Sequence, residues 1–485
     1  MKKIATMILL WAMFICRGYA KDQQPIKVAC LGASITYGSR IENREQNSYP
    51  AQLQRMLGDC YHVVNYGVAG TTLLQSGDHP YGQTAAYQTA LAANPDIVII
   101  DLGGNDAKLI NRVHLECFRK DYHELIESFK QLRSHPRIIL LTAMASFVTD
   151  TTSVWDPVLI KQINPLVQQV AYDNKVEVID MHSPFVDKAA LFSDKLHPNA
   201  AGAAIMALNV YRVLAISRDS TFHLVDKLGI THTTSSYYGY TCADFKFHGR
   251  NCKIVEPKAA AKGHPWIWRA RFWGHEPQTE IALLQLGYHV VYCDMAELLG
   301  NQESVSLWDK FYDFIHGKGL TRMATMEGMS RGGLYVFNWA AENPSKVMAV
   351  YVDNPLLNMP SWALNYPLDS NDPMYAAFKK DYQISTKEDI NTLKQSPVDK
   401  INEIVKGGYP ILILCADADE AVDPQQNTLL FEKRIREAGG RITVIHKPGF
   451  KHHPHSFPNP EVIVRFLFNA FDTSLANLNT KTEVK

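Results

Sequence analysis

Five residues in the N-terminal half of the sequence have the types and the order that cleavage of an ester requires. Ser34 follows the short apolar run "IKVAC" and carries a hydroxyl that could attack a carbonyl carbon. Asp194 and His197 stand close together in "SDKLHPNAAG", so the carboxylate can hold one imidazole nitrogen while the other faces the serine. Gly70 in "VNYGVAG" and Asn105 in "LGGND" could donate hydrogen bonds to the oxyanion that such an attack creates.

Each of these residues also has an ordinary structural interpretation. Ser34 could cap a helix, Asp194 could cap another, and His197 could be a surface histidine before a proline. Asn105 and Gly70 are residue types that turns favour. The occurrence of all five in this order along one stretch of chain favours the catalytic interpretation.

This order of motifs resembles the SGNH (GDSL-like) hydrolases over about residues 26–213. The resemblance implies a role for each residue: Ser34 is the nucleophile, Asp194 and His197 are the acid and base, and Gly70, Asn105 and the Ser34 backbone N–H form the oxyanion hole. Ala33 departs from the family, which usually has Asp or Asn there, and this puts the tuning of the site in doubt more than its existence.

A second candidate nucleophile, Ser330, lies in the GxSxG pattern "GMSRG" of residues 328–332. This pattern is common by chance, and a glycine-rich structural turn is the alternative. Here an apolar strand precedes the pattern and a helical segment follows it. Gly328 and Gly332 would relieve the crowding of a sharp turn from strand to helix, which favours a nucleophile.

The acid and the base of this second set should follow the serine along the chain. The segment "ILILCADADEAVDP" offers Asp417 and Asp419, and "HKPGFKHHPHSF" offers His452, His453 and His455. The order of serine, aspartate and histidine resembles the α/β-hydrolase superfamily over about residues 235–472.

The register of that resemblance selects one residue from each group. It implies Asp419 as the acid, although Asp423 stands where the family's proline would be and Pro424 follows. It implies His452, shortly after the glycine of "PGFK", as the base, with His453 as the alternative.

The same resemblance implies that the Arg331 backbone N–H donates to the oxyanion. A second donor is expected near Ala270 or Arg271, although the HGGG pattern of many lipases is absent from this loop. The aromatic residues around the loop are expected to pack in the core, with stacking of one of them on a sugar ring as the alternative. They are Trp266, Trp268, Phe272 and Trp273.

The histidine cluster at residues 452–455 also raises the question of a metal. No carboxylate or thiolate is spaced beside it as a zinc site would need, so hydrolase chemistry explains the cluster better. We therefore expect no metal and no cofactor.

Short apolar runs that alternate with amphipathic stretches must position these residues. In the N-terminal half the runs are "KVACLG", "HVVNYG", "DIVIIDLGGND", "RIILLTAM" and "VEVIDM". Apolar strands separated by helical segments predict a mainly parallel sheet covered on both faces. We expect an α/β domain at residues 21–215, for which the SGNH resemblance implies a flavodoxin-like three-layer fold.

The same alternation returns after a polar stretch that predicts a linker at residues 216–234. A second α/β domain, also mainly parallel, is expected at residues 235–475, with a cap insertion near 355–408 and a tail at 476–485. The two halves share no visible repeat, which indicates two different α/β domains.

Residues 1–20 combine two lysines with a short apolar stretch and resemble an export signal. Cys16 invites a lipid anchor, but the bulky Phe14 and Ile15 before it fit that processing poorly. We expect a periplasmic or secreted protein that begins near Lys21 and has no stable membrane insertion.

The composition limits the partners and the redox chemistry. Lys+Arg and Asp+Glu both total 49 in 485 residues, so the formal net charge is zero and nucleic acid is not indicated as a partner. The eight cysteines show no zinc-finger spacing. Cys242 and Cys252 flank a segment that could form a hairpin, which leaves one disulfide as an option.

Together the resemblances imply an exported, metal-independent ester hydrolase with two serine sites, which removes acyl groups such as acetyl from a small-molecule or glycan ester. Two alternatives stay open. One half could be a glycan-binding or scaffolding module, or the C-terminal half could be a peptidase. Comparing the rates of hydrolysis of an aryl acetate and of an aminoacyl anilide distinguishes an esterase from a peptidase.

Overall fold

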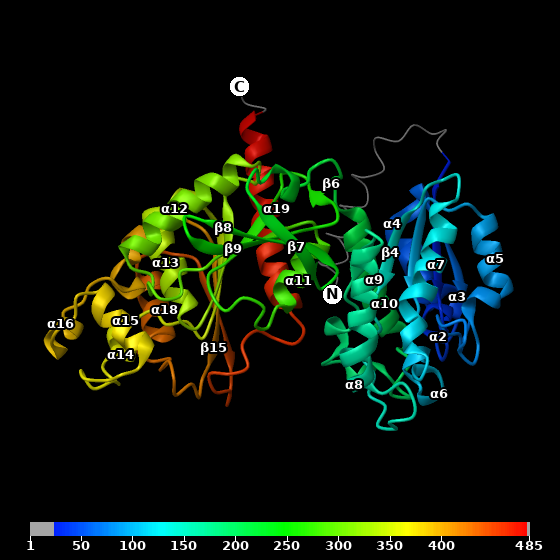
Figure 1. The fold of residues 1–485 in the computed structure, drawn as a ribbon, viewed down its shortest axis with the longest axis horizontal. Helices are drawn as coiled ribbons and strands as arrows, with labels where there is room; N and C mark the ends of the chain where they lie inside the picture. The colour runs from blue at the N-terminus through cyan, green and yellow to red at the C-terminus, as the bar shows by residue number, and fades with distance from the viewer. Residues whose placement is uncertain (1–23, 483–485) are drawn as a thin grey trace. The chain divides into compact units, whose positions relative to one another are not determined.

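The computed structural model describes residues 24–482, so the expected leader at residues 1–20 lies outside the described residues. The chain divides into two compact units (Figure 1). One comprises the chain up to Ser217 together with Ser236–Tyr240, and the other comprises Arg218–Ser235 and the chain from Thr241 onward. Within residues 24–482, no helix has both the length and the apolar character needed to cross a membrane.

The sheet of the first unit has the strand order β2-β1-β3-β4-β5, and all its pairs are parallel. The strands are β1 (Ile26–Gly32), β2 (Tyr61–Gly67), β3 (Ile97–Asp101), β4 (Arg137–Leu141) and β5 (Glu177–Ile179). This is the flavodoxin-like order, in which ligands bind beyond the carboxyl ends of the strands. The α/β prediction for this half is therefore confirmed.

Helices cover both faces of this sheet. They include α2 (Ser34–Tyr37), α3 (Arg44–Asn47), α4 (Tyr49–Leu57), α5 (Ala85–Ala92), α6 (Leu109–Arg112), α7 (Phe118–Lys130), α8 (Asp156–Val158), α9 (Asn164–Asp173) and α10 (Ala200–Ala215). Leu53 of α4 and Val210 of α10 share one core cluster with Val28 of β1. Ala29 and Leu31, which point to the opposite face of the same strand, are equally buried.

The second unit contains a mixed sheet in the order β16-β15-β14-β13-β11-β12-β9-β8-β7. Neighbouring strands in the stretch β16-β15-β14-β13-β11-β12 pair in parallel. Strand β9 pairs antiparallel with β12 and with β8. The strands are β7 (His232–Tyr237), β8 (Tyr240–Phe247), β9 (Arg250–Glu256), β11 (Trp266–Arg269), β12 (His289–Cys293), β13 (Ala324–Met329), β14 (Val347–Asp353), β15 (Ile411–Ala416) and β16 (Ile442–Lys447). Every residue of β13, β14 and β15 is buried, as expected of strands covered on both faces.

The helices of the second unit are α11 (Gln278–Gln285), α12 (Gln302–Gly317), α13 (Gly332–Glu342), α14 (Met359–Ala363), α15 (Pro373–Asp381), α16 (Lys387–Asn391), α17 (Ile401–Lys406), α18 (Thr428–Glu437) and α19 (Glu461–Thr482). Residues 355–408, where a cap is expected, contain α14–α17 between β14 and β15 in the chain. Residues expected to form a tail from 476 continue α19 as far as Thr482.

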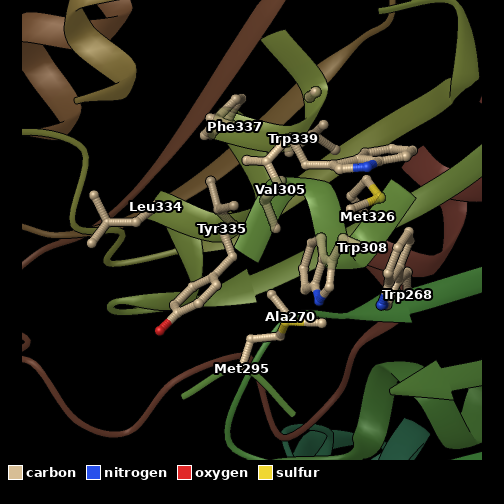
Figure 2. Packing of buried hydrophobic residues seen from close by; sticks show 14 of the residues in the cluster. Trp268, Ala270, Met295, Val305, Trp308, Met326, Leu334, Tyr335, Phe337 and Trp339 are labelled. Carbon is tan, nitrogen blue, oxygen red and sulfur yellow. The ribbon is translucent and has the colours of Figure 1, made fainter. Parts of the chain in front are cut away.

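Large aromatic side chains fill the core of the second unit. Figure 2 shows Trp268 of β11 beside Trp308 of α12 and Trp339 of α13, with ring centroids 4.3 Å and 5.2 Å from that of Trp268. Trp266 and Trp268 are both fully buried, so neither can stack on a sugar, and their role is core packing.

Residues 216–234 do more than link the two units. Arg218–Asp219 forms β6, which pairs with β10 (Ala260–Ala261), and Leu224 and Leu228 are buried in the core of the second unit. The hairpin tip Ser236–Tyr240 belongs to the first unit. The chain therefore passes between the units more than once, which the polar composition of this stretch did not indicate.

The optional disulfide between Cys242 and Cys252 is absent, because both residues are free thiols. In the hairpin of β8 and β9, Cys242 lies opposite Val255 rather than Cys252. Cys252 instead lies opposite Cys293 on β12, with the two sulfur atoms 3.3 Å apart.

Candidate active sites

A tight turn at the end of β1 presents Ser34. The residue begins α2 directly after Gly32 and Ala33. A Cβ atom on Gly32 would lie 2.1 Å from Thr36 Oγ1 and 2.8 Å from the Asp101 carbonyl oxygen. Only glycine lets strand and helix approach this closely, and the approach holds the Ser34 hydroxyl at the carboxyl edge of the sheet.

Gly32→Ala is expected to lower the free energy of unfolding by about 1–3 kcal/mol, because the added Cβ forces packed atoms apart. Gly104→Ala is the matched control: it belongs to the same unit, its φ is −60°, and its added Cβ meets no atom within 4 Å. The control should change the free energy of unfolding by less than about 0.5 kcal/mol. Chemical denaturation measures both, and equal effects would contradict the turn described above.

The first unit brings Ser34, His197 and Asp194 into one hydrogen-bonded chain. Nε2 of His197 lies 2.8 Å from Ser34 Oγ, and Nδ1 lies 2.8 Å from Asp194 Oδ2. The short loop before α10 makes this arrangement local, since Asp194 and His197 belong to the same turn. The distances are those of a serine whose proton a histidine can accept.

Asp194 is held as an ionised acceptor. Partial burial would raise the pKa of its carboxyl, but the backbone N–H groups of His197 and Leu196 and the imidazole of His197 lower the pKa to about 2. Arg40 adds a charged neighbour, with its Nε 3.7 Å from Oδ2. A carboxylate in this state can orient the His197 ring and stabilise its protonated form.

The candidate oxyanion donors Gly70 and Asn105 lie on two loops that contact each other. Asn105 is buried, and its Nδ2 donates to the carbonyl oxygen of Thr71, the residue after Gly70. Gly70 adopts a φ of +84°, a left-handed conformation that favours glycine. This contact fixes the Asn105 side chain relative to the loop that carries the Gly70 N–H.

Asp106, which is not among the residues predicted from the sequence, holds the same two loops together. This fully buried carboxylate accepts hydrogen bonds from the N–H groups of Leu73, at 3.0 Å, and Leu74, at 2.8 Å. Burial raises the pKa of its carboxyl to about 6, against the opposing effect of these N–H groups. Its place directly after Asn105 was the signal that could have identified it.

Ser34 and Asn105 line a small pocket with mostly apolar walls. The other lining residues are Ala33, Ile35, Asp101, Gly104, Ala143, Met144, Val154, Leu159 and Leu196. The cavity measures about 40 Å³. By this measure a single water needs about 10–15 Å³, so the space suits a small group better than a long chain.

The second candidate nucleophile, Ser330, occupies a sharp turn between β13 and α13. Its φ is +50°, which is strained for a residue other than glycine. A Cβ atom on Gly328 would lie 2.8 Å from the Gly332 carbonyl carbon, and one on Gly333 would lie 2.6 Å from Pro355 Cβ. These contacts explain the glycines on both sides of the serine, and the geometry is that of a nucleophile elbow.

His452 joins Ser330 to Asp419. Its Nε2 lies 2.9 Å from Ser330 Oγ, and its Nδ1 lies 2.7 Å from Asp419 Oδ2. Asp419 is buried and also accepts hydrogen bonds from the N–H groups of Ala421 and Val422. Burial would raise the pKa of Asp419, but the bonds from His452 and these N–H groups hold it below its usual value.

The alternative residues for this triad lie elsewhere. Asp417 is exposed and pairs with His446, with 2.6 Å between its Oδ1 and the His446 Nδ1. His453 lies with its ring centroid 5.0 Å from that of His452 and contacts His455 and His275 instead. The two hydrogen bonds that a base needs are made by His452.

Two backbone N–H groups are the candidates for oxyanion donors at the second site. Arg331 directly follows Ser330 at the start of α13, where backbone N–H groups have no partner within the helix. The N–H of Ala270 donates to the Glu327 carbonyl oxygen, so it is not available for an oxyanion. Arg271 is left as the second candidate, and the buried Arg269 holds the peptide that follows it by donating from Nε to the Arg271 carbonyl oxygen at 3.0 Å.

Comparison with known proteins finds one family over part of the chain. Residues 30–205 match the GDSL-like Lipase/Acylhydrolase family. An acetylxylan esterase of Xylanibacter ruminicola is 36% identical over 206 residues, which cover 39% of this chain and 43% of that protein. The chain thus spans less than half the length of this curated relative.

Solved structures with similar folds are more distant. A putative dipeptidyl aminopeptidase IV of Bacteroides ovatus matches with a TM-score of 0.39 and 16% identity, covering 50% of this chain and 36% of that one. Est1E of Butyrivibrio proteoclasticus matches with a TM-score of 0.35 and 18% identity, covering 51% of this chain and all of that one. With the strand order and the Ser34 turn described above, the family match shows that residues 30–205 form a GDSL-like lipase/acylhydrolase domain.

Proposed function

We propose that this chain is a serine ester hydrolase with two independent catalytic sites, one in each unit. The observation that carries the proposal is the pair of hydrogen-bonded serine, histidine and aspartate chains, each complete within its own unit. A glycan-binding half would have no need for a second such chain.

The same steps apply at both sites. As the serine oxygen attacks the ester carbonyl, the histidine Nε2 accepts its proton, while the aspartate holds the Nδ1–H and balances the positive ring. Backbone and amide N–H groups stabilise the oxyanion. The histidine then protonates the leaving alcohol, and water, activated by the same histidine, hydrolyses the acyl-enzyme.

At the first site an acetyl group on carbohydrate is the substrate that we infer. The pocket beside Ser34 is small and mainly apolar, with Ile35 and Met144 among its walls, which suits a methyl group. The matched relative is named an acetylxylan esterase, which supports a carbohydrate as the alcohol part. For the second site we propose an ester as the substrate, without specifying its acyl group or its alcohol.

Acetylated xylo-oligosaccharides test this proposal, with mass spectrometry counting the acetyl groups removed. The wild-type protein should release acetate, and chains esterified with long acyl groups should react much more slowly. No release from any acetylated oligosaccharide would contradict the carbohydrate assignment. Cleavage of aminoacyl anilides but not aryl acetates by the Ser34→Ala variant would make the second site a peptidase.

Export is a separate expectation of the sequence. Secreted material should begin at or near Lys21 and carry no lipid, because residues 1–20 have the composition of a cleavable signal. N-terminal sequencing together with intact mass measures this. A mature chain that begins with a lipid-modified Cys16 would overturn it.

A further inference from the structure

Three histidines that the proposed mechanism does not use gather beside the second serine site. His275, from the loop after β11, meets His453 and His455, and one ring nitrogen from each lies within 4.8 Å of the others. The ring centroid of His275 lies 5.8 Å from that of His453 and 5.9 Å from that of His455. The cluster joins segments of the chain that are far apart in sequence, so it is a product of the fold.

His455 has the second contact that metal-binding histidines usually make. It is almost fully buried, and its Nδ1 lies 3.1 Å from Asp353 Oδ1. Asp353 is itself held by Lys447 Nζ at 3.0 Å and by the Ser456 N–H at 2.7 Å. A carboxylate that holds one imidazole nitrogen orients the other for a metal, so Nε2 of His455 is the candidate ligand.

The backbone that carries His275 is also held in place. The buried Arg269 guanidinium donates from Nη2 to the carbonyl oxygens of Phe272 and His275. The Arg269 guanidinium in turn pairs with Glu280 in the core. The loop is therefore fixed, while the exposed ring of His275 can still rotate.

Zinc–nitrogen bonds measure about 2.0–2.1 Å, so two ligands of one ion lie at most ~4.2 Å apart. The three candidate nitrogens lie within 4.8 Å of one another, so coordination of one ion requires the exposed rings of His275 and His453 to turn toward it.

We propose that His275, His453 and His455 form a three-histidine site for a divalent cation of the zinc class, and that the bound cation inhibits the neighbouring serine site. Three imidazole ligands with a fourth position open to water are an established arrangement for zinc.

The inhibition follows from the position of His452, and this part rests on the proposed function. The His452 ring centroid lies 5.0 Å from that of His453 and 4.9 Å from that of His455. Catalysis requires His452 to become positively charged when it accepts the serine proton. A dication held by its neighbours repels that charge and so disfavours the step.

Calorimetric titration of the full-length protein with Zn²⁺ at neutral pH tests the site itself. The wild type should bind Zn²⁺ at this site, and His275→Ala and His453→Ala should each weaken that binding at least tenfold. His248→Asn, at an exposed turn of the same unit, is the control and should not weaken it. His446→Ala removes a ligand from the second candidate cation group of the described residues, Cys415, Asp417 and His446, and should leave binding at the three-histidine site unchanged. Absence of binding, or equal binding by the two cluster variants and the wild type, would overturn the site.

Inhibition is measured as the rate of ester hydrolysis by the Ser34→Ala variant, in which the remaining activity belongs to the second site. Saturating Zn²⁺ should slow aryl acetate hydrolysis at least tenfold, and a chelator should restore it. Histidine-dependent binding with unchanged rates would overturn the inhibition and leave the site intact. If this variant has no hydrolytic activity, the proposed function fails for the second unit, while the titration still decides the site.

Discussion

Ser34→Ala is expected to remove one esterase activity and Ser330→Ala the other, each by roughly 10⁴ to 10⁶-fold in kcat, since a triad without its nucleophile retains little catalysis. The two effects should be independent, because neither hydrogen-bonded chain uses a residue of the other unit. Acyl release by the wild type, both single variants and the double variant on a panel of esters measures this.

The stability of these variants provides the control. A serine-to-alanine change removes a single oxygen and leaves no sizeable cavity, so the free energy of unfolding should change by less than about 1 kcal/mol. If Ser34→Ala leaves every rate unchanged while Ser330→Ala abolishes all turnover, the first unit is no working esterase on that panel. The binding-module interpretation would then gain support for the first unit.

Asp419→Asn, made in the Ser34→Ala background, should lower kcat of the second site by roughly 10⁴-fold. The amide cannot hold the Nδ1–H of His452 as the carboxylate does, and the ring then adopts the wrong tautomer. Rates with an aryl acetate substrate measure the loss.

Asp417→Asn is the matched control for that variant. Asp417 lies two residues before Asp419 on the same loop, but it is exposed and contacts His446 rather than His452. It should retain activity within a few-fold of its parent, because the Asp417–His446 pair lies outside the hydrogen-bonded chain of the second site. A large loss from Asp417→Asn with full activity in Asp419→Asn would reverse the assignment of the acid.

Local patterns in the sequence are sufficient to predict the strands and several of the residues that the structure brings together. Continuous apolar runs such as "DIVII" predicted buried parallel strands, because a strand covered on both faces has no polar side to show. Asp194 and His197 were recognisable as a pair because they share one turn, so little had to be known of the tertiary fold.

Features that depend on which strands become neighbours could not be predicted in the same way. Cys252 faces Cys293 only because β9 pairs with β12, an arrangement that no local pattern encodes. Likewise, no carboxylate or thiolate is spaced beside His453 and His455 in the sequence. The fold brings Asp353, from the end of β14, and His275, from the loop after β11, to this cluster.

The most direct test of two separate serine sites is covalent labelling with diisopropyl fluorophosphate, which phosphorylates activated serines, followed by intact mass and peptide mapping. The account predicts two adducts on the wild-type protein, at Ser34 and Ser330, one adduct on each single alanine variant, and none on the double variant. A wild-type protein that takes up a single adduct, or a double variant that is still labelled, would contradict it.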